Sequence, residues 1–395
     1  MGADLAVDTV RPDQMDAELR GLWAEFRAAG PAFRSPYFDL RYVLAAGAFT
    51  PGAQIAVISR RGRVEGLFAF QRRGRLIQPI AAPLTDYHGP LLRPGCAIDL
   101  ARLTAALGAR RFRFSGLAGT APPKGAARRT AMIADLSKGY DAYLAGRRSD
   151  FLKDKRRRAR RLAEAHGPLS FDLAGEGEGA LDFILRLKRA QLRRTGQHDI
   201  FSSPWVEAFV RELAGRQEPG FGVRFATLRA GGRLIAAEMG LRSEAAYHLW
   251  FPVYDPRFAR YSPGSLMTLE TLRALAGQGV ATVDFGAGGE AYKRDFADPG
   301  PVVWEGEVAH GGWAEAARGA ADRMLSGAPR ARRALSEAGG RLDRRWDCIA
   351  ACEPRLDGKA RAVSRALAVL ARRKPRASIG IGLGLGLGIY GLLAE

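Results

Sequence analysis

Two neighbouring stretches of the sequence each predict a turn rich in small residues at the start of a helix. In the first, residues 260–264 (Arg-Tyr-Ser-Pro-Gly), the Pro-Gly pair opens a helix whose apolar residues recur about every 3.6 positions. In the second, residues 280–296, a short β-branched strand runs into a Gly-rich turn and then into a helix start that carries Tyr292 and Lys293. Helix starts of this kind point unpaired backbone N–H groups outward, which favours phosphate. Together the stretches predict a cleft with an anion site on one side and a Tyr/Lys pair on the other.

Length, charge and cysteine content set the frame for this cleft. A chain of 395 residues exceeds one ordinary hydrophobic core and suits two domains with an appendage. The formal net charge of +20 favours nucleotides, nucleic acid, phospholipid or acidic polymers as partners, although a genomic bias toward arginine would give the same excess. The three cysteines form no C-x-x-C pair. We therefore predict no disulfide scaffold and no metal site, as suits a reducing compartment.

The two ends of the chain bear on localisation. The N-terminus lacks the basic and apolar regions of a signal peptide, which predicts a cytoplasmic protein. Residues 378–393 are uncharged and alternate with glycine, but they are too few for the roughly twenty residues of a membrane-spanning helix. We expect a frayed tail. The alternative is a tether that, with the basic residues 372–376, holds the protein peripherally at the inner face of a membrane.

The order of predicted elements gives an α+β fold with a mostly antiparallel, mixed sheet and helices on both sides. Residues 1–120 form a first unit with two helices, a three-strand meander, a helix and a strand. Residues 131–311 form a second unit, in which a basic helix (150–166) precedes the same order. A basic helical extension (312–374) and a Gly-rich apolar tail (375–395) follow. The shared order suggests an internal duplication, and the segment 118–129 reads as the linker.

Several motifs of the second unit together resemble the GNAT acyltransferase superfamily, in particular its CelD/BcsL-type, cellulose-biosynthesis-associated branch. They are the Arg-rich helix, the strand R-L-I-A-A-E-M-G-L, V-Y-D-P, Y-S-P-G and D-F-G-A-G-G-E-A-Y-K, which span roughly residues 145–300. More distantly, the paired units resemble the FemAB-like double-GNAT peptidyltransferases. The pyrophosphate loop departs from the superfamily pattern because R-Y-S-P-G-S holds one glycine. The first unit has no such loop and is expected to be non-catalytic.

The resemblance implies an acyl-CoA cosubstrate, with acetyl-CoA expected, and transfer to an amine or hydroxyl. It places the donor along splayed strands at 238–241 and 284–285. The pyrophosphate would then meet the start of the helix that follows, at Arg260, Tyr261, Ser262, Gly264 and Ser265. Tyr292 would protonate the leaving thiolate, since a phenol has a suitable donor and basicity; the alternative is an aromatic that packs the helix on the sheet. Lys293 would hold a phosphate or the oxyanion.

Glu238 is the predicted general base. It lies in an otherwise apolar strand, where an unpaired carboxylate is costly, and it shares a strand face with the small residues Ala236 and Gly240, which leaves room for a ligand. His248 and Asp255 are alternatives as the base, and Asp255 is also expected to bind substrate. Asp284 either contacts substrate or caps the Gly-rich turn.

The basic helix is expected to border the acceptor groove. Arginines project from it widely, and Arg157 and Arg161 are predicted to attract an anionic acceptor or the 3′-phosphate of CoA; a solvated surface helix is the alternative.

The predicted function is an acyl-CoA-dependent N- or O-acyltransferase with a cell-envelope, polysaccharide or lipid-linked acceptor. An aminoacyl-tRNA donor, as in the FemAB-like group, is a second enzymatic interpretation. A non-catalytic basic adaptor at a membrane or nucleic acid is a third.

Overall fold

The structure is a computed structural model that describes residues 5–174 and 178–309, together with 346, 348–353, 359 and 364. The predicted basic extension at 312–374 lies almost entirely outside the described residues, and the tail at 375–395 lies wholly outside them. The described chain repeats one order of elements, once in residues 5–135 (the first half) and once in residues 140–309 (the second half).

The first half is built from two helices, a strand meander, a third helix and two final strands. In chain order these are β1 (Leu5–Val10), α1 (Ala17–Ala28), α2 (Leu40–Phe49), β2 (Ala53–Arg60), β3 (Arg63–Arg73), β4 (Leu76–Pro79), β5 (Leu91–Leu92), α3 (Leu100–Ala106), β6 (Arg111–Leu117) and β7 (Ala127–Asp135). Short 3-10 helices η1 (Pro12–Gln14), η2 (Pro31–Phe33) and η3 (Pro36–Phe38) lie around α1.

The second half opens with two extra helices, α4 (Tyr140–Ala145) and α5 (Ser149–His166), and then follows the same plan. Its elements are β8 (Leu169–Ala174), α6 (Glu178–Thr195), η4 (Ile200–Ser202), α7 (Pro204–Gly215), β9 (Gln217–Glu218), β10 (Phe221–Ala230), β11 (Arg233–Ser243), β12 (Ala246–Leu249), β13 (Val253–Tyr254), η5 (Pro256–Tyr261), α8 (Pro263–Gly277), β14 (Thr282–Asp284), η6 (Ala291–Asp295) and β15 (Asp298–Ala309).

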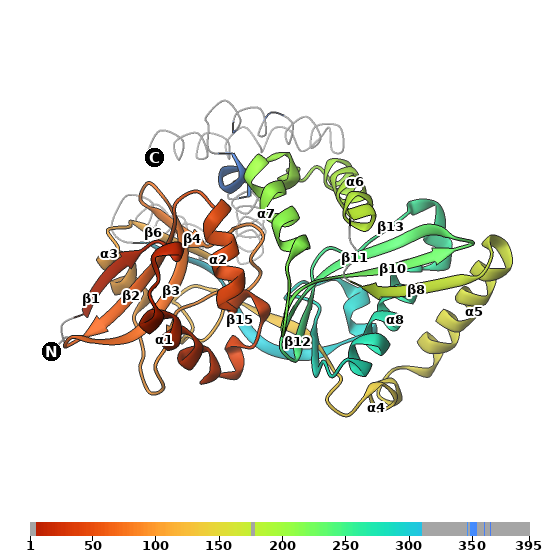
Figure 1. Cartoon of the computed structure of the whole chain (residues 1–395), viewed down its shortest axis with the longest axis horizontal. Helices are drawn as coiled ribbons and strands as arrows, with labels where there is room; N and C mark the ends of the chain where they lie inside the picture. The colour runs from red at the N-terminus through yellow and green to blue at the C-terminus, as the bar shows by residue number, and fades with distance from the viewer. Residues whose placement is uncertain are drawn as a thin grey trace, which may run out of the picture.

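One continuous sheet joins the two halves (Figure 1). Its main path runs β1-β2-β3-β4-β6-β15-β7-β14-β12-β11-β10-β8, so that equivalent strands of the halves mirror each other about the centre. Among the described strands, β4 with β6 and β12 with β14 pair in parallel, and the other named pairs are antiparallel. The expected mostly antiparallel α+β fold is confirmed.

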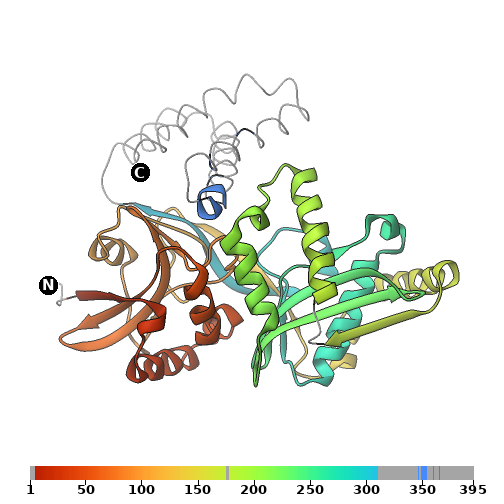
Figure 2. The same cartoon turned by 45° about the horizontal axis from the view of Figure 1, so that its top comes forward.

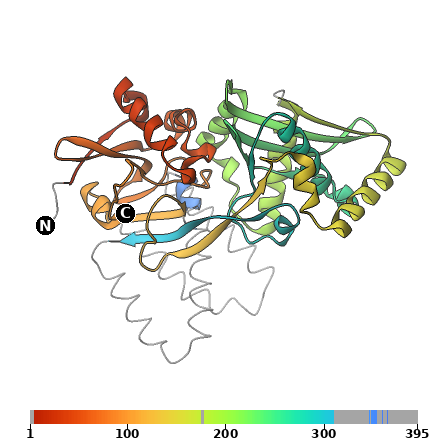
Figure 3. The ribbon, with the colours of Figure 1, turned by 90° about the horizontal axis from the view of Figure 1, so that it is seen from below.

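The halves exchange their last strands at the centre of the sheet. β7 ends the first half but pairs with β14 of the second, whereas β15 ends the second half and pairs with β6 of the first. β7 and β15 also pair with each other, and Figure 3 shows them running side by side between the lobes. Because of this exchange, the segment 118–129, expected to be a linker, already contains the start of a central strand.

Helices cover both faces of the second half's sheet (Figures 1 and 2). Along β11, Ala237, Met239 and Leu241 point into the core shared with α6 and α7, and Ala236 points into the core under α5 and α8. This alternation is the two-residue period of a strand buried on both faces. A side chain of β11 therefore lies either on the α6 and α7 face of the sheet or on the α5 and α8 face.

Most predicted elements are present, with several differences in the second half, among them the unpredicted short strand β9. The strand expected at 245–253 ends at Leu249, and a separate short strand, β13, follows it. The helix expected after the Gly-rich turn is only the 3-10 helix η6. The helix α4 was not predicted.

Candidate functional site

The strands β12 and β14 form a parallel pair, and they separate at one end. Their ladder ends at the pair His248–Asp284. Beyond it, the chain from β12 turns to pair with β11 through Val253 and Ala237, while the chain from β14 enters the Gly-rich turn. The expectation that Glu238–Leu241 and Asp284 lie on the two diverging strands is wrong, because β12 lies between β11 and β14. The diverging pair is β12 and β14.

The helix α8 begins after β13 and η5, between β12 and β14 in the chain. Ser262 adopts the left-handed conformation (φ 55°, ψ 50°), and no described side chain accepts a hydrogen bond from the first turn in the manner of a cap. Pro263 has no N–H, so Gly264 and Ser265 present the outward-facing backbone donors. A Cβ added at Gly264 would lie 3.4 Å from the Tyr254 ring, which flanks this helix start. These donors make the first turn of α8 able to receive an anion.

Tyr292 lies on η6, which follows the Gly-rich turn after β14. It and Tyr254 are the two large apolar side chains that stand out as exposed among the described residues, at 47% and 46%. Burial of part of the phenol, with the charges of Glu290 and Glu238, raises the pKa of Tyr292 to about 12. The phenol therefore keeps its proton at neutral pH and can donate it.

Glu238 is fully buried, with 0% of the residue exposed. Tyr247 donates a 3.4 Å hydrogen bond to Oε1, and Oε2 has no partner within the described part of the chain. Burial raises the pKa of Glu238 to about 8. The predicted room for a ligand beside it is filled, because a Cβ at Gly240 would lie 2.0 Å from the Tyr247 hydroxyl. Glu238 faces the α8 side and is mainly protonated at neutral pH.

His248 forms a second group of polar side chains on the opposite side of the sheet. Its Nε2 lies 2.9 Å from Asp86 Oδ2 and its Nδ1 lies 3.8 Å from Asp284 Oδ1. The Tyr37 ring packs edge-on against the imidazole, with 5.0 Å between centroids. Burial lowers the pKa of His248, but the hydrogen bond to Asp86 and the charges of Asp284 and Asp86 outweigh burial and raise it.

Asp284 connects this group to the Gly-rich turn. Its Oδ1 accepts hydrogen bonds from the Gly286 N–H at 2.6 Å and from the Tyr87 hydroxyl at 3.0 Å. Burial is the main cause that raises the pKa of Asp284. The turn-capping interpretation of Asp284 thus describes one of its contacts.

Lys293, on η6, also contacts the Gly-rich turn. Its Nζ is 2.9 Å from Glu290 Oε2 and 3.5 Å from the Gly286 carbonyl oxygen. Lys293 is itself buried, whereas Glu290 is exposed. Lys293 and Tyr292 therefore face different surroundings although they are adjacent in sequence.

Sequence reasoning missed Asp86 and Tyr87, which come from the first half. Their segment, L-T-D-Y-H-G-P, lies between Pro83 and Pro90 and has no regular structure. The only signal was a cluster of polar and aromatic residues in an irregular, proline-framed loop. Loops of this kind carry functional residues, but nothing local shows which strand they meet.

Asp255 lies apart from these groups. It caps η5 by accepting a hydrogen bond from the Arg257 N–H, and it forms ion pairs with Arg257 at 2.6 Å and Arg233 at 3.6 Å. These bonds to Arg257 are the main cause that lowers the pKa of Asp255. Its contacts stabilise the turn that leads into α8.

The basic helix α5 packs against that turn and bounds a hollow of about 500 Å³. Arg157, Arg158 and Arg161 line it from α5, and Arg260 and Tyr261 line it from η5. Arg158 donates to the backbone oxygen of Arg260, which holds α5 against η5. The predicted residues Arg157 and Arg161 therefore lie together with the predicted pyrophosphate residues Arg260 and Tyr261.

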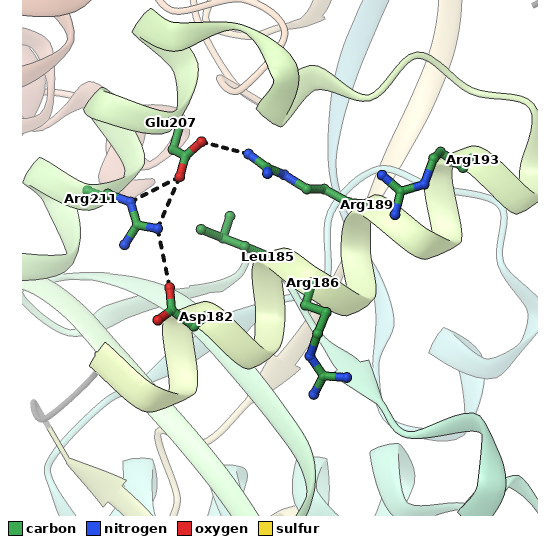
Figure 4. Close-up of a pocket in the computed structure, with 7 residues that line it drawn as sticks. All are labelled: Asp182, Leu185, Arg186, Arg189, Arg193, Glu207 and Arg211. Carbon is green, nitrogen blue, oxygen red and sulfur yellow. Dashed lines mark hydrogen bonds and ion pairs between the residues drawn. The ribbon is translucent and has the colours of Figure 1, made fainter. Parts of the chain in front are cut away.

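A second hollow, of about 330 Å³, lies between α6 and α7. Glu207 lies between Arg189, at 2.6 Å, and Arg211, at 3.0 Å, and Arg211 also reaches Asp182 (Figure 4). This network neutralises two of the arginines that line the hollow and links the two helices. The ion pairs account for its polar lining.

No group of three or more His, Cys, Asp and Glu side chains suited to a metal ion occurs in the described part of the chain. Across the same residues, none of the helices has the length and apolar character to span a bilayer.

Comparison with known protein families identifies the second half. Residues 149–294 match the family model described as an acetyltransferase (GNAT) domain. This part of the chain, from α5 to η6, is a GNAT acetyltransferase domain, and the resemblance to that superfamily is confirmed. The match gives the domain its enzymatic class and its acyl-CoA donor, but it does not identify the acceptor.

Several solved structures match the chain at low sequence identity. A tandem GNAT protein from the clavulanic acid biosynthesis pathway is 14% identical, with 78% of this chain and 99% of that chain covered and a TM-score of 0.49. FemX is 12% identical, with coverage of 76% and 96% and a TM-score of 0.45. A GCN5-related N-acetyltransferase from Sphaerobacter thermophilus is 10% identical, with coverage of 77% and 95% and a TM-score of 0.42. No curated protein matches the sequence.

Proposed function

We propose that the protein transfers an acyl group, with acetyl expected, directly from acyl-CoA to an amine or hydroxyl, and that the donor binds the second half. One observation carries this proposal. The start of α8 has no side-chain cap and follows η5, after the chain has left the β12–β14 pair. Within a GNAT domain, this is a suitable place for the pyrophosphate and the thioester arm.

The two ends of CoA have different partners in this proposal. The backbone N–H groups of Gly264 and Ser265 receive the pyrophosphate, next to Tyr261 and Ser262. The arginine-lined hollow between α5 and η5 receives the 3′-phosphate, since guanidinium groups suit phosphate. Arg157 and Arg161 would then serve the donor and not an anionic acceptor.

Tyr292 is proposed as the proton donor to the departing thiolate. The phenol is protonated at neutral pH, and its exposed position leaves the hydroxyl accessible. Lys293 is proposed to supply positive charge at the Gly-rich turn, close to the developing oxyanion. As a base, Glu238 would be active only at pH values near or above its pKa of about 8.

The proposed acceptor is a cell-envelope, polysaccharide or lipid-linked molecule, met in the cytoplasm or at the inner face of a membrane. The motifs that resemble the CelD/BcsL-type branch and the net charge of +20 support this choice.

Calorimetry with CoA tests where the donor binds. A Gly264→Val side chain would project at the helix start and obstruct the approach of the pyrophosphate to the backbone. We expect the Kd for CoA to rise at least about 10-fold, equivalent to about 1.4 kcal/mol. Gly277→Val, at the other end of α8 and in open space, is the matched control and should leave Kd unchanged. Equal binding by wild type and Gly264→Val would refute the donor site.

A further inference from the structure

The outward side of α5 carries a line of basic side chains. Phe151 and Leu162 are buried and hold the helix against the second half. Since an α-helix has 3.6 residues per turn, Lys153, Arg156 and Arg160 lie on one line along the opposite side of the helix. All three residues are exposed. We call Lys153, Arg156 and Arg160 the α5 basic stripe.

The carboxylates of α5 leave most of this positive charge in place. Among the described residues, no carboxylate forms an ion pair with Lys153 or Arg156. Arg160 lies 3.6 Å from Glu164, but the two side chains are 73% and 64% exposed, and ion pairs so open to water are weak. Asp154 pairs with basic residues outside the stripe. The stripe therefore presents its charge to the solvent.

The stripe faces away from the hollow proposed for the 3′-phosphate of CoA. Arg157 and Arg161 line that hollow together with Arg260. They stand one position after Arg156 and Arg160 in the sequence, which turns them about 100° around the helix. A partner that meets the stripe thus leaves Arg157 and Arg161 available to CoA.

Arg273 on α8 extends the basic surface beyond α5. Its guanidinium lies over the Tyr140 ring, 5.4 Å from the centroid. Burial raises the pKa of Tyr140, and the charges of Arg273 and Arg156 oppose this rise, so both guanidinium groups lie near the same phenol. Arg273 pairs with Glu270 at 3.1 Å but is still 61% exposed. Because α5 lies at the outer edge of the second half, away from the first half, this surface is one end of the molecule (Figures 1 and 3).

The shape and composition of this surface favour an extended sheet of negative charge as its partner. Neither of the two hollows described above contains a residue of the stripe, so the stripe offers no enclosed place for a small anion. Nucleic-acid sites commonly add aromatic side chains that stack on bases and amide side chains that reach base edges. The sequence of α5 has no Asn, Gln, Tyr or Trp, and its one Phe is buried. Lys and Arg alone are sufficient to attract anionic lipid headgroups.

We propose that the α5 basic stripe docks the protein on a membrane surface that contains anionic lipid. The proposal deepens the proposed function, on which it rests for an acceptor met at a membrane, because docking brings the acyltransferase domain to a lipid-linked acceptor. The docking itself requires no CoA.

Sedimentation of the full-length protein with vesicles tests the stripe. We expect binding to phosphatidylcholine vesicles that contain phosphatidylglycerol, and no binding to phosphatidylcholine alone. The triple variant Lys153→Gln, Arg156→Gln and Arg160→Gln should partition about 10²-fold less, since each basic residue near an anionic surface contributes about 5-fold. Salt should weaken wild-type binding, because the screening length falls from about 8 Å at physiological ionic strength to about 3 Å at 1 M.

A matched control removes the same charge from the other half of the molecule. Arg63, Arg75 and Arg102 are exposed residues of the first half, and none of them forms an ion pair within the described residues. Replacing these three with Gln should leave vesicle binding as in the wild type. Both triple variants should keep the wild-type melting temperature, because solvated surface charges contribute little to stability.

Three results would overturn the proposal: no binding of the wild type to phosphatidylglycerol vesicles, wild-type binding by the stripe variant, or an equal loss in the control variant. Duplex DNA that binds through the stripe, without vesicle binding, would replace lipid by nucleic acid. Calorimetry with CoA distinguishes this proposal from the donor site. The stripe variant should bind CoA as the wild type does, and a wild type that sediments with vesicles but binds no CoA would refute the donor site alone.

Discussion

The two halves share one order of elements, and they differ at the parallel strand pair. This pair is β4 with β6 in the first half and β12 with β14 in the second. In the first half, the chain beyond β4 returns to β6. His88 bridges to Leu117, the His88 N–H donates to the Gly116 carbonyl at 3.2 Å, and the Ala118 N–H donates to the His88 carbonyl at 2.8 Å. In the second half, the chain beyond β12 pairs with β11 through β13, as β5 pairs with β3 in the first half, but no equivalent bridge to β14 is found among the described residues. The first half has therefore closed the opening that the second half keeps.

The helix between the two strands of each pair, α3 in the first half and α8 in the second, also differs in how its start is capped. The Asp99 side chain caps α3 by accepting a 2.8 Å hydrogen bond from the Ala101 N–H. Its carboxylate both occupies a donor and places negative charge where phosphate would bind. The start of α8 has no such carboxylate among the described residues. Under the proposed assignment of the donor to the second half, a duplicated topology alone does not make a donor site, and the path of one loop and one capping residue distinguish the halves.

The closed loop of the first half has a second consequence. It carries Asp86 and Tyr87 across to His248 and Asp284 of the second half. The half without an opening thus adds side chains to the half that has one.

The largest effect is expected from the proton donor of the second half. Tyr292→Phe removes one hydroxyl, so the half-exposed ring keeps its packing while proton donation to the thiolate is lost. We expect kcat to fall roughly 10²-fold with an unchanged melting temperature. Tyr254→Phe, equally exposed, is the matched control. Unchanged turnover in Tyr292→Phe would leave that residue a packing role.

A capping carboxylate should make α8 resemble α3. Ser262 is in the left-handed conformation, which Asp and Asn tolerate, so Ser262→Asp should fold and place negative charge at the helix start. We expect the Kd for CoA to rise about 10-fold or more, measured by calorimetry. Ser262→Asn, which is isosteric and neutral, should change it far less. If both variants bind CoA equally well, charge at the α8 start does not distinguish the halves.

The buried carboxylate of the second half should make stability depend on pH. The pKa of Glu238 is about 8 when folded, against an ordinary value of 4.5, so the folded state holds a proton that the unfolded state releases between these values. Stability contributed at this site therefore falls as pH rises from about 4.5 to 8. The melting temperature of Glu238→Gln should exceed that of wild type by a margin that grows from pH 5 to pH 9. A constant margin would mean that Glu238 does not titrate in this range.

The smallest effect is expected from the arginines of α5. Replacing Arg157 and Arg161 with Gln should weaken CoA binding a few-fold, and less so at high salt, because exposed charges are screened within about 8 Å at physiological ionic strength. Dephospho-CoA, which lacks the 3′-phosphate, should bind both proteins alike. Arg160→Gln lies on the same helix outside the hollow and serves as control. If the double variant loses affinity equally for CoA and dephospho-CoA, these arginines do not bind the 3′-phosphate.

The sequence predicted the α+β class and most elements because strand alternation, helical periodicity and Pro-Gly turns are local signals. It also placed Ser262, Gly264 and Ser265 at a helix start, which the structure shows, whereas Arg260 and Tyr261 form the end of η5. Two features were beyond it. The insertion of β12 between β11 and β14 depends on strand pairing, and the contact between Asp86 and His248 joins positions far apart in the chain. Neither leaves a periodic trace in the sequence.

Hydrogen exchange of the full chain with and without CoA tests most directly whether only the second half binds the donor. The account predicts new protection of the amides of Gly264 and Ser265 at the start of α8, with no change at Ala101 in the first turn of α3. Protection at the start of α3, or CoA binding that leaves the start of α8 unprotected, would contradict it.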